Sequence, residues 1–372
     1  MIHSVDRIEN LNDYARYSKE MTNYERSLPN LIRSFLNKFD DNMNFYGLLI
    51  IQLCENLEHL LGKKAKIVKV RAPTIVIPEL HGNFDYLKCI EKEFSPLRPE
   101  NETGMIFLGN YIGSKEKTTR SVDVIAYLFS LKMLDVNRVV LLRGLQESAK
   151  TIPKLMKECN QRFESIGEQV CNAIVSVLES LPYVAIINET ICCLPSGFPK
   201  EAAKTSLFHF FETISSSSIH VTRDVLTQFC KSRPSEINPR VRSKPSNRSK
   251  KSNRKSFSKP KVLRSRSLIS NSVGNNVGGK KSIPNIDENI FYQFLTNNQF
   301  NHMIRSGDNS ENFSIAFNKR CFTLAANELK GNGIQSCIMS IDGSLNMRCI
   351  SFTYDAAPRE EGVRRTHSCV EF

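Results

Sequence analysis

Three short loops of the sequence carry the side chains best suited to chemistry. The first holds Glu79 and His81, the second Asn110, and the third Arg143 and Glu147. Carboxylate, imidazole and amide groups can bind a divalent cation, and a guanidinium can hold an anion. A lone histidine near a carboxylate is also common in solvated loops, so these side chains form a site only if the fold brings the loops together.

Each loop follows an apolar run that predicts a β-strand. Residues 66–77 predict two short strands rich in β-branched side chains, and residues 105–108 and 138–142 predict two more. Helical spacing follows at residues 84–90 and 122–134. Repeated strand–loop–helix units predict a mixed α/β protein, in which ligands bind at the carboxyl ends of the strands.

Apolar spacing predicts further elements on both sides of these units. Helical patterns cover residues 24–62 and 170–181, and residues 183–194 predict a β-hairpin. Residues 290–304 predict another helix, and residues 322–354 predict at least three strands.

The positive charge of the chain is concentrated in residues 231–282. This segment holds 16 Lys or Arg, 13 Ser and one acidic residue. It therefore carries +15, whereas the formal net charge of the whole chain is +13, so the remaining residues carry −2. Such a composition cannot bury enough apolar surface to offset the entropy lost on ordering. We predict a long disordered insertion within a compact domain.

Apolar content and cysteine usage indicate where the chain resides. No apolar run approaches the roughly 20 residues that a bilayer-spanning helix needs, and the start of the chain lacks the apolar core of a secretory signal. The 11 cysteines form neither a CxxC pair nor a disulfide framework. We expect an intracellular protein, cytoplasmic or nuclear, with no membrane partner.

The order of short motifs in these loops resembles that of the phosphoprotein phosphatase (PPP) family of serine/threonine phosphatases. The resemblance covers roughly residues 24–354 apart from the insertion. It implies an α/β fold with a metallophosphatase-like central β-sandwich flanked by helices. The matching stretches are Pro78-Glu-Leu-His-Gly82, Gly109-Asn-Tyr-Ile-Gly113, Leu141-Leu-Arg-Gly-Leu-Gln-Glu147, Cys192-Cys-Leu-Pro-Ser196 and Arg305-Ser-Gly307.

This resemblance gives an expected domain organisation. An N-terminal extension (residues 1–23) precedes the first part of a phosphatase-like domain (24–230). The basic insertion (231–282) separates it from the second part (283–355), and a C-terminal tail (356–372) follows.

The resemblance also implies an altered metal site. Family members use two metal ions to activate water for phosphoserine and phosphothreonine hydrolysis. Here Glu79 stands for an aspartate, His81 is retained, and Asn110 replaces the aspartate that bridges both ions. These three imply a vestigial site: no cofactor is expected, or at most one divalent ion (Mn, Fe or Zn). The residues at lost ligand positions are Leu145, Leu194 and Gly307.

No catalytic residue is expected at the family's other positions. Gln146 replaces the histidine that protonates the leaving group, and a glutamine side chain has no proton to give at neutral pH. Arg143, Glu147 and Arg305 match the family, and we expect them to support the fold. The chain is interpreted as a pseudophosphatase.

Three interpretations of the basic insertion remain open. It is a solvated spacer, a contact for nucleic acid or an acidic partner, or a target of regulatory phosphorylation. Aromatic side chains are almost absent from it, which disfavours base stacking. Residues 248–255 also resemble a nuclear-import signal. The candidate phosphorylation sites, each shortly after an arginine, are Ser256, Ser267, Thr366 and Ser368.

The leading functional hypothesis is a catalytically impaired phosphatase-like protein that acts as a regulatory or scaffolding binding module. Its expected partners are proteins, either phosphatase-type regulators or phosphoproteins. A divergent metal-dependent phosphoserine/phosphothreonine phosphatase is the first alternative. Nucleic-acid or acidic-partner binding through residues 231–282 is the second.

Overall fold

The described part of the chain belongs to one compact unit, formed by Met1–Ser235 and Pro284–Phe372. The structure is a computed structural model. It describes residues 28–30, 32, 33, 36, 43–62, 65–94, 102–113, 120–215, 219–234, 285–307, 312–328, 333–354 and 368–372.

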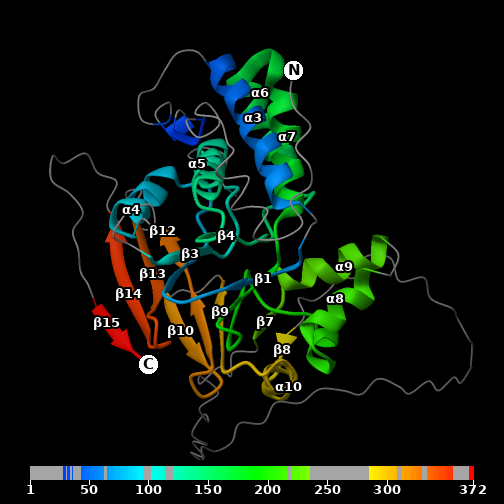
Figure 1. Ribbon diagram of the computed structural model, residues 1–372, viewed down its shortest axis with the longest axis vertical. Coiled ribbons are helices and arrows are strands. Elements are labelled where there is room, and N and C mark those ends of the chain that lie inside the picture. The colour runs from blue at the N-terminus through cyan, green and yellow to red at the C-terminus, as the bar shows by residue number, and fades with distance from the viewer. Residues whose placement is uncertain are drawn as a thin grey trace, which may run out of the picture. The chain divides into compact units, whose positions relative to one another are not determined.

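The first of two large sheets combines strands from both halves of the chain (Figure 1). Its order is β1 (Ile67–Val70), β5 (Val184–Ile187), β6 (Ile191–Leu194), β9 (His302–Ser306), β11 (Cys321–Leu324) and β10 (Phe313–Ala316). Strands β5 and β6 form the predicted hairpin. Strand β9 runs parallel to both β6 and β11, so these three strands end at the same edge.

The second sheet contains the three strands that precede the candidate loops. Its order is β15 (Ser368–Glu371), β14 (Met347–Tyr354), β13 (Ile334–Ile341), β2 (Thr74–Ile77), β3 (Gly104–Phe107) and β4 (Val139–Leu141), with β12 (Ala326–Glu328) paired to β13. Strands β2, β3 and β4 are parallel neighbours, as the sequence predicts. A small pair joins β7 (Arg233–Pro234) to β8 (Asn285–Ile286).

The two sheets pack face to face over a shared apolar core. Val76 and Ile106 of the second sheet lie in this core with Ala185 and Ile304 of the first. Alternate residues point to opposite faces of a strand, so Ile75, beside Val76, faces a different core. The predicted central β-sandwich flanked by helices is therefore confirmed.

Helices cover the outer face of each sheet (Figure 1). The second sheet packs against α3 (Met43–Leu61), α4 (Phe84–Phe94), α5 (Ser121–Leu134), α6 (Ile152–Phe163) and α7 (Gly167–Ser180). The first sheet packs against α8 (Leu207–Ser215), α9 (Ile219–Phe229) and α10 (Glu288–Asn298). Short 3-10 turns occur at η1 (Glu164–Ile166) and η2 (Lys200–Lys204). No helix in the described ranges is long and apolar enough to cross a bilayer.

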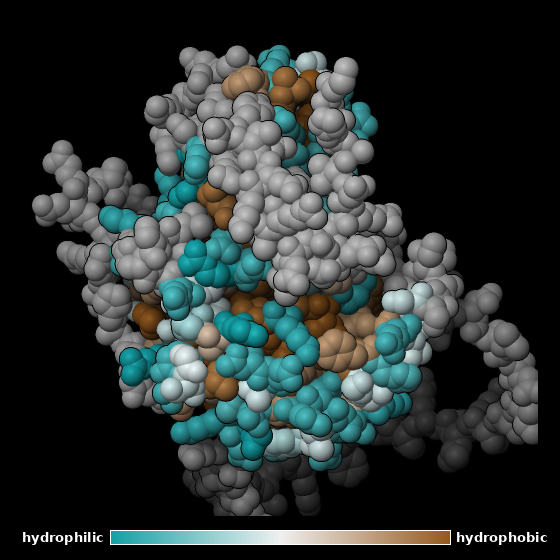
Figure 2. Space-filling view, viewed as in Figure 1, coloured by the Kyte–Doolittle hydropathy of each residue, from teal (hydrophilic) through white to brown (hydrophobic). Residues whose placement is uncertain are grey.

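The described part of the surface carries few large apolar side chains. Figure 2 shows one face that is mostly hydrophilic, with hydrophobic residues gathered toward its middle. Among the described residues, the large hydrophobic side chains with the greatest exposure are Phe45, Leu48, Phe208 and Ile315.

Three features differ from the sequence-based expectations. Helix α10 ends at Asn298, and the predicted helix over 290–304 is wrong in its last part, because Gln299 adopts a left-handed conformation (φ 59°) and β9 begins at His302. The expected C-terminal tail ends in strand β15. A disulfide joins Cys337 to Cys349, although no disulfide is expected from the spacing of the cysteines.

Several predicted features lie largely outside the described residues. Of the expected insertion, only residues 231–234 are described. They follow α9, and the last two of them form β7. The N-terminal extension, Ser256, Ser267 and Thr366 lie outside the described ranges. Ser368 begins β15, but its side chain is not described.

A buried ion cluster ties three helices together on the outer face of the second sheet. Asp123 of α5 is 1% exposed and accepts from Arg120 Nε at 2.6 Å and from Arg162 Nη1 of α6 at 2.5 Å. The Tyr46 hydroxyl of α3 donates to the same carboxylate at 3.4 Å. Burial and the nearby Asp123 carboxylate raise the pKa of Tyr46 well above its ordinary value, so it stays a neutral donor.

Replacing this carboxylate should destabilise the helical layer. Asp123→Ala leaves two guanidinium groups without their shared acceptor, and because both remain partly exposed we expect a loss of about 2 kcal/mol in the free energy of unfolding. Urea denaturation followed by circular dichroism measures it. Asp85→Ala is the control, since its pair with Lys88 is exposed and the expected loss is below about 0.5 kcal/mol. Equal losses in the two variants would contradict the assignment.

Candidate functional site at the ends of the parallel strands

The three candidate loops meet at one edge of the second sheet. They follow β2, β3 and β4, whose parallel pairing places their carboxyl ends side by side. The His81 N–H donates to the Asn110 carbonyl at 2.8 Å, which joins the first loop to the second. Both residues have positive φ, 47° for His81 and 58° for Asn110, a conformation that needs support from the surrounding structure.

Two glycines allow the second and third loops to approach closely. Gly109 has φ +94°, and a Cβ there would lie 2.5 Å from the Gly144 nitrogen. A Cβ on Gly144 would lie 2.5 Å from the Asn110 nitrogen. Real Cβ atoms do not approach backbone atoms this closely, so a side chain at either glycine would push the loops apart.

The Glu147 carboxylate fills the space between these loops. It is 1% exposed and accepts hydrogen bonds from the backbone N–H groups of Asn110 and Gly144 at 2.8 Å, Tyr111 at 2.7 Å and Ile112 at 3.3 Å. Burial raises the pKa of the Glu147 carboxyl above its ordinary value, and the four donors act in the opposite direction. All its contacts are to main chain, so this carboxylate organises the loops.

Arg143 supports the same turn from its outer side. Its guanidinium donates to the Glu147 carbonyl at 3.1 Å and to the Glu179 carbonyl at 3.4 Å. It also lies over the Tyr183 ring at 5.9 Å. The described contacts of Arg143 therefore join the third loop to the end of α7.

The Glu79 carboxylate is bound by neutral donors. It is 3% exposed, and Glu79 Oε2 accepts from the Ser306 hydroxyl at 2.7 Å and from Asn110 Nδ2 at 3.5 Å. Ser306 comes from the end of β9 in the other sheet, 227 residues away in sequence, and is fully buried. Sequence reasoning did not single out Ser306, although it lies within the matched stretch Arg305-Ser-Gly307.

The orientation of the Asn110 amide follows from a backbone donor. The Gln146 N–H donates to Asn110 Oδ1 at 3.0 Å. The amide oxygen must face that donor, and so the NH₂ group faces Glu79. His81 Nε2 lies 3.9 Å from Glu79 Oε1, and its side chain is 28% exposed.

Arg305 and Gly307 occupy the end of β9 beside Ser306. The buried Arg305 guanidinium donates to the Ser196 carbonyl and, at 2.9 Å, to the Thr323 hydroxyl. A Cβ on Gly307 would lie 2.6 Å from Arg305 Nη2. The guanidinium therefore takes the space into which a side chain at position 307 would grow.

The two leucines that the family resemblance places at lost ligand positions belong to one apolar cluster. Leu194 is fully buried, and Leu145 is partly buried and packs against the same cluster on the outer side of the first sheet. The cluster also contains aromatic rings such as Phe198 and Phe294, which stack at 3.9 Å. Neither leucine side chain has an atom that could bind a cation.

These residues do not fit a two-metal centre. Within the described ranges, no group of three or more His, Cys, Asp or Glu side chains is arranged to hold a metal ion. The Asn110 amide oxygen is engaged with a backbone N–H, and one Glu79 oxygen is engaged with Ser306. Among the described side chains of these loops, Glu79 and His81 present groups close enough to share one ion, across 3.9 Å.

Part of the chain is similar in sequence to known serine/threonine phosphatases. No protein-family profile matches the chain. The serine/threonine-protein phosphatase SIT4 of Candida albicans is 29% identical over 153 residues, covering 40% of this chain and 47% of that protein. The PP2A-like phosphatase PPG1 of Saccharomyces cerevisiae is 27% identical over 147 residues, covering 39% and 38%. The predicted resemblance to serine/threonine phosphatases of the phosphoprotein phosphatase family is therefore confirmed over this part of the chain.

The fold agrees with that of a solved serine/threonine phosphatase. A Saccharomyces cerevisiae serine/threonine phosphatase with similarity to human phosphatase PP5 superposes with a TM-score of 0.57 at 15% identity. The superposition covers 85% of this chain and 92% of that one. The expected metallophosphatase-like fold is therefore confirmed, whereas the matched region spans less than half the length of the two curated relatives.

The loop arrangement should depend more on Glu147 than on Glu79. In the wild type, both Glu147 oxygens accept hydrogen bonds from backbone N–H groups. In Glu147→Gln, an NH₂ group replaces one of these oxygens and faces N–H donors, so we expect a loss of about 3 kcal/mol in the free energy of unfolding. Glu79→Gln keeps an acceptor for Ser306 and should cost below about 1 kcal/mol. Chemical denaturation compares the two. A larger loss for Glu79→Gln would show that the loops are organised around the other carboxylate.

Restoring the family histidine at position 307 should be unfavourable. In Gly307→His the new Cβ displaces the Arg305 guanidinium from buried hydrogen bonds, and we expect a loss of about 2 kcal/mol. The control is Gly343→His, because a Cβ at Gly343 meets no atom within 4 Å. Thermal or urea unfolding gives both values, and an unchanged Gly307→His variant would mean that Arg305 relocates freely.

Proposed function

We propose that this chain is a catalytically impaired phosphatase-like protein that acts as a regulatory or scaffolding binding module. The observation that carries the proposal is the contact of the buried Glu79 carboxylate with Ser306 and Asn110. In the family resemblance Glu79 is the one acidic side chain kept at the metal ligands, and here its Oε2 oxygen accepts from two neutral protein donors.

Electrostatics supports the proposal. Two divalent cations in a partly buried site need several anionic ligands, because a charge taken out of water without compensation is costly. Glu147, the other carboxylate at the loops, is turned toward four backbone N–H groups. Glu79 alone therefore supplies negative charge, which is insufficient for two metal ions.

The residue at the family's proton-donor position also supports the proposal of impaired catalysis. Gln146 stands where the family has the acid that protonates the leaving group, and an amide has no accessible protonated state near neutral pH. The Gln146 main chain instead serves as a donor to Asn110. Without metal ions and without an acid, the family reaction lacks both of its main sources of transition-state stabilisation.

A divergent metal-dependent phosphatase is the second candidate. The 3.9 Å separation of His81 Nε2 and Glu79 Oε1 would allow both to bind one Mn, Fe or Zn ion. Asn110 could join them only if its amide turned away from the Gln146 N–H. Hydrolysis in this case would depend on His81.

Protein partners follow from the binding-module proposal, and we place their encounter in the cytoplasm or nucleus. Regulators of phosphatases and phosphoproteins are the proposed classes. Nucleic-acid or acidic-partner binding by residues 231–282 rests on the charge of the segment alone. It would show as an affinity that falls steeply with salt.

Metal content and activity test the proposal together. Purified chain is equilibrated with Mn²⁺, freed of loosely bound ions and analysed for metal, and hydrolysis of p-nitrophenyl phosphate and a phosphoserine peptide is measured with Mn²⁺ present. We expect less than about 0.1 ion per chain and no activity above that of the His81→Ala variant. Two ions per chain, or hydrolysis that disappears in His81→Ala, would reject the pseudophosphatase interpretation.

A further inference from the structure

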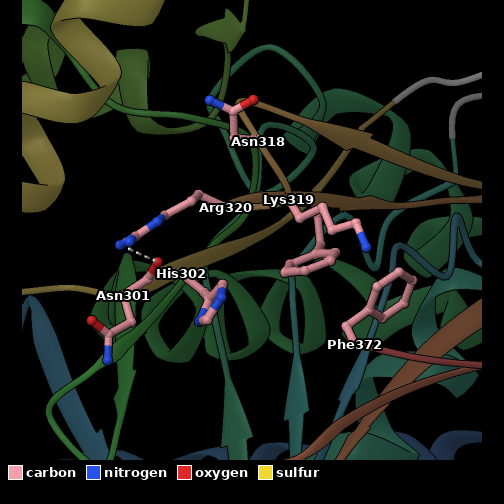
Figure 3. A pocket seen from close by; sticks show the side chains of 7 residues that line it. Asn301, His302, Asn318, Lys319, Arg320 and Phe372 are labelled. Atoms are coloured by element: carbon pink, nitrogen blue, oxygen red, sulfur yellow. Dashed lines mark hydrogen bonds between the residues drawn. The ribbon is translucent and has the colours of Figure 1, made fainter.

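The structure describes eight free cysteines, and all of them are buried. Figure 3 shows a cavity of about 250 Å³ beside His302 and Phe372, and none of these cysteines lines it. A small oxidant therefore reaches the thiols only through local opening of the packing. The contacts of each thiol then decide whether it reacts.

Cys159 and Cys171 occupy facing positions in a helical hairpin. Helices α6 and α7 lie side by side (Figure 1) and are joined by the short turn η1. Cys159 lies one helical turn before Phe163, the last residue of α6, and Cys171 lies one turn after Gly167, the first residue of α7. Because residues four apart share a face of a helix, each cysteine lies on the side of its helix that faces the connection.

The hairpin is tightly packed at its closed end. A Cβ on Gly167 would lie 2.6 Å from the Asn160 Cα and 2.8 Å from the Asn160 nitrogen, so α7 begins directly against the backbone of α6. Cys159 and Cys171 are both fully buried and belong, with Phe163, to the same apolar cluster. The first turn on each side of the connection therefore brings the two thiols together.

The two thiols form a hydrogen bond with each other. This hydrogen bond lowers the pKa of the Cys171 thiol and raises the pKa of Cys159. Cys171 is therefore the more nucleophilic of the two, because the thiolate is the reactive form. A disulfide bond is about 2 Å long, and thiols that already share a hydrogen bond need only small side-chain rotations to reach that distance.

Helix α6 also contacts the start of α5 and, through it, the second candidate loop. Glu158, beside Cys159, accepts from the Val122 N–H at 2.9 Å and from the Ser121 hydroxyl. The Ser121 hydroxyl oxygen in turn accepts from the Gly113 N–H at 3.2 Å, at the end of that loop. A covalent link at Cys159 would thus act on a helix that helps to hold the loop.

We propose that Cys159 and Cys171 form a redox modification site, at which hydrogen peroxide generates a disulfide that clamps α6 to α7. In a reducing compartment such a disulfide is transient and reports oxidation. This site is independent of the proposed binding function, because it needs neither a metal ion nor catalysis at the strand ends.

Oxidation proceeds in two steps. The Cys171 thiolate attacks one peroxide oxygen, the O–O bond breaks, and the leaving hydroxide takes up the proton that Cys171 released. The product is a sulfenic acid. The Cys159 sulfur then attacks the sulfenic sulfur, the S–O bond breaks, and a second water leaves with the Cys159 proton. The two thiols together lose two electrons, which reduce hydrogen peroxide to water.

Mass spectrometry of the full-length wild type tests the site without any substitution. The reduced chain is exposed to hydrogen peroxide, unfolded in an alkylating reagent and digested, and the peptides joined through Cys159 and Cys171 are quantified. Cys192 and Cys193 are the matched control, because both are fully buried in β6 while their side chains lie in different clusters on opposite faces of the sheet. We expect the link in more than about half of the chains, its loss after dithiothreitol, and at least about tenfold less oxidation of the control thiols.

Two alanine variants test the order of the steps. In Cys159→Ala, oxidation should stop at the sulfenic acid of Cys171, which dimedone traps, since no second thiol condenses with it. In Cys171→Ala, the Cys159 thiol should remain reduced, because burial still raises its pKa when the hydrogen bond is gone. The thermal unfolding midpoint of the oxidised wild type should rise by about 4 °C, whereas that of Cys159→Ala should not rise.

Several outcomes would overturn the proposal. They are the absence of the linked peptide from the oxidised wild type, equal oxidation of the control thiols, an unchanged unfolding midpoint, and stronger dimedone labelling of Cys171→Ala than of Cys159→Ala. None of these measurements depends on metal content or hydrolysis, so failure here is distinguishable from failure of the proposed function.

Discussion

The arrangement of the candidate site depends on one carboxylate that faces main chain. The Glu147 carboxylate accepts hydrogen bonds from the N–H groups of Asn110, Tyr111, Ile112 and Gly144. These bonds hold the second and third loops together. The contact is possible only because Gly109 and Gly144 leave space where a Cβ would collide. The first loop joins through the His81 N–H and the Asn110 carbonyl. The conformations of the three loops thus depend on the buried Glu147 carboxylate and on the absence of a side chain at Gly109 and Gly144.

With the loops fixed in this way, several of the remaining polar side chains of the site form hydrogen bonds within the protein. Ser306 reaches across from the other sheet to Glu79, and the Gln146 main chain determines the orientation of the Asn110 amide. An ion entering this site would have to compete with those hydrogen bonds. The net gain in binding free energy would be small, because only one carboxylate is available to the ion. The same hydrogen bonds join the loops through protein groups, which supports the proposed binding module.

The parts of this site that the sequence predicts are those with a local signal. Apolar runs followed by irregular loops predict β2, β3 and β4, and parallel pairing then brings Glu79, His81 and Asn110 together. The Ser306 contact has no local signal, because its partner lies 227 residues away. Strand β9 is buried on both faces, so its residues lack the alternation that would distinguish it from the end of a helix. The pairing of β15 and the disulfide between Cys337 and Cys349 are likewise set by long-range contacts.

The residues that maintain the framework are separate from those that the family resemblance assigns to metal-ligand positions, and this separation allows the fold to persist when the side chains at those positions differ. Glu147 and Arg143 bond to backbone N–H and carbonyl groups, and these contacts do not involve the side chains at positions 145 and 194. The two ends of the parallel strands are also independent. Ser306 lies at the carboxyl end of β9, whereas His302 at its start borders the cavity near Phe372. A strand of this length separates them by about 13 Å, so a side chain at one end of β9 does not contact the candidate site at the other.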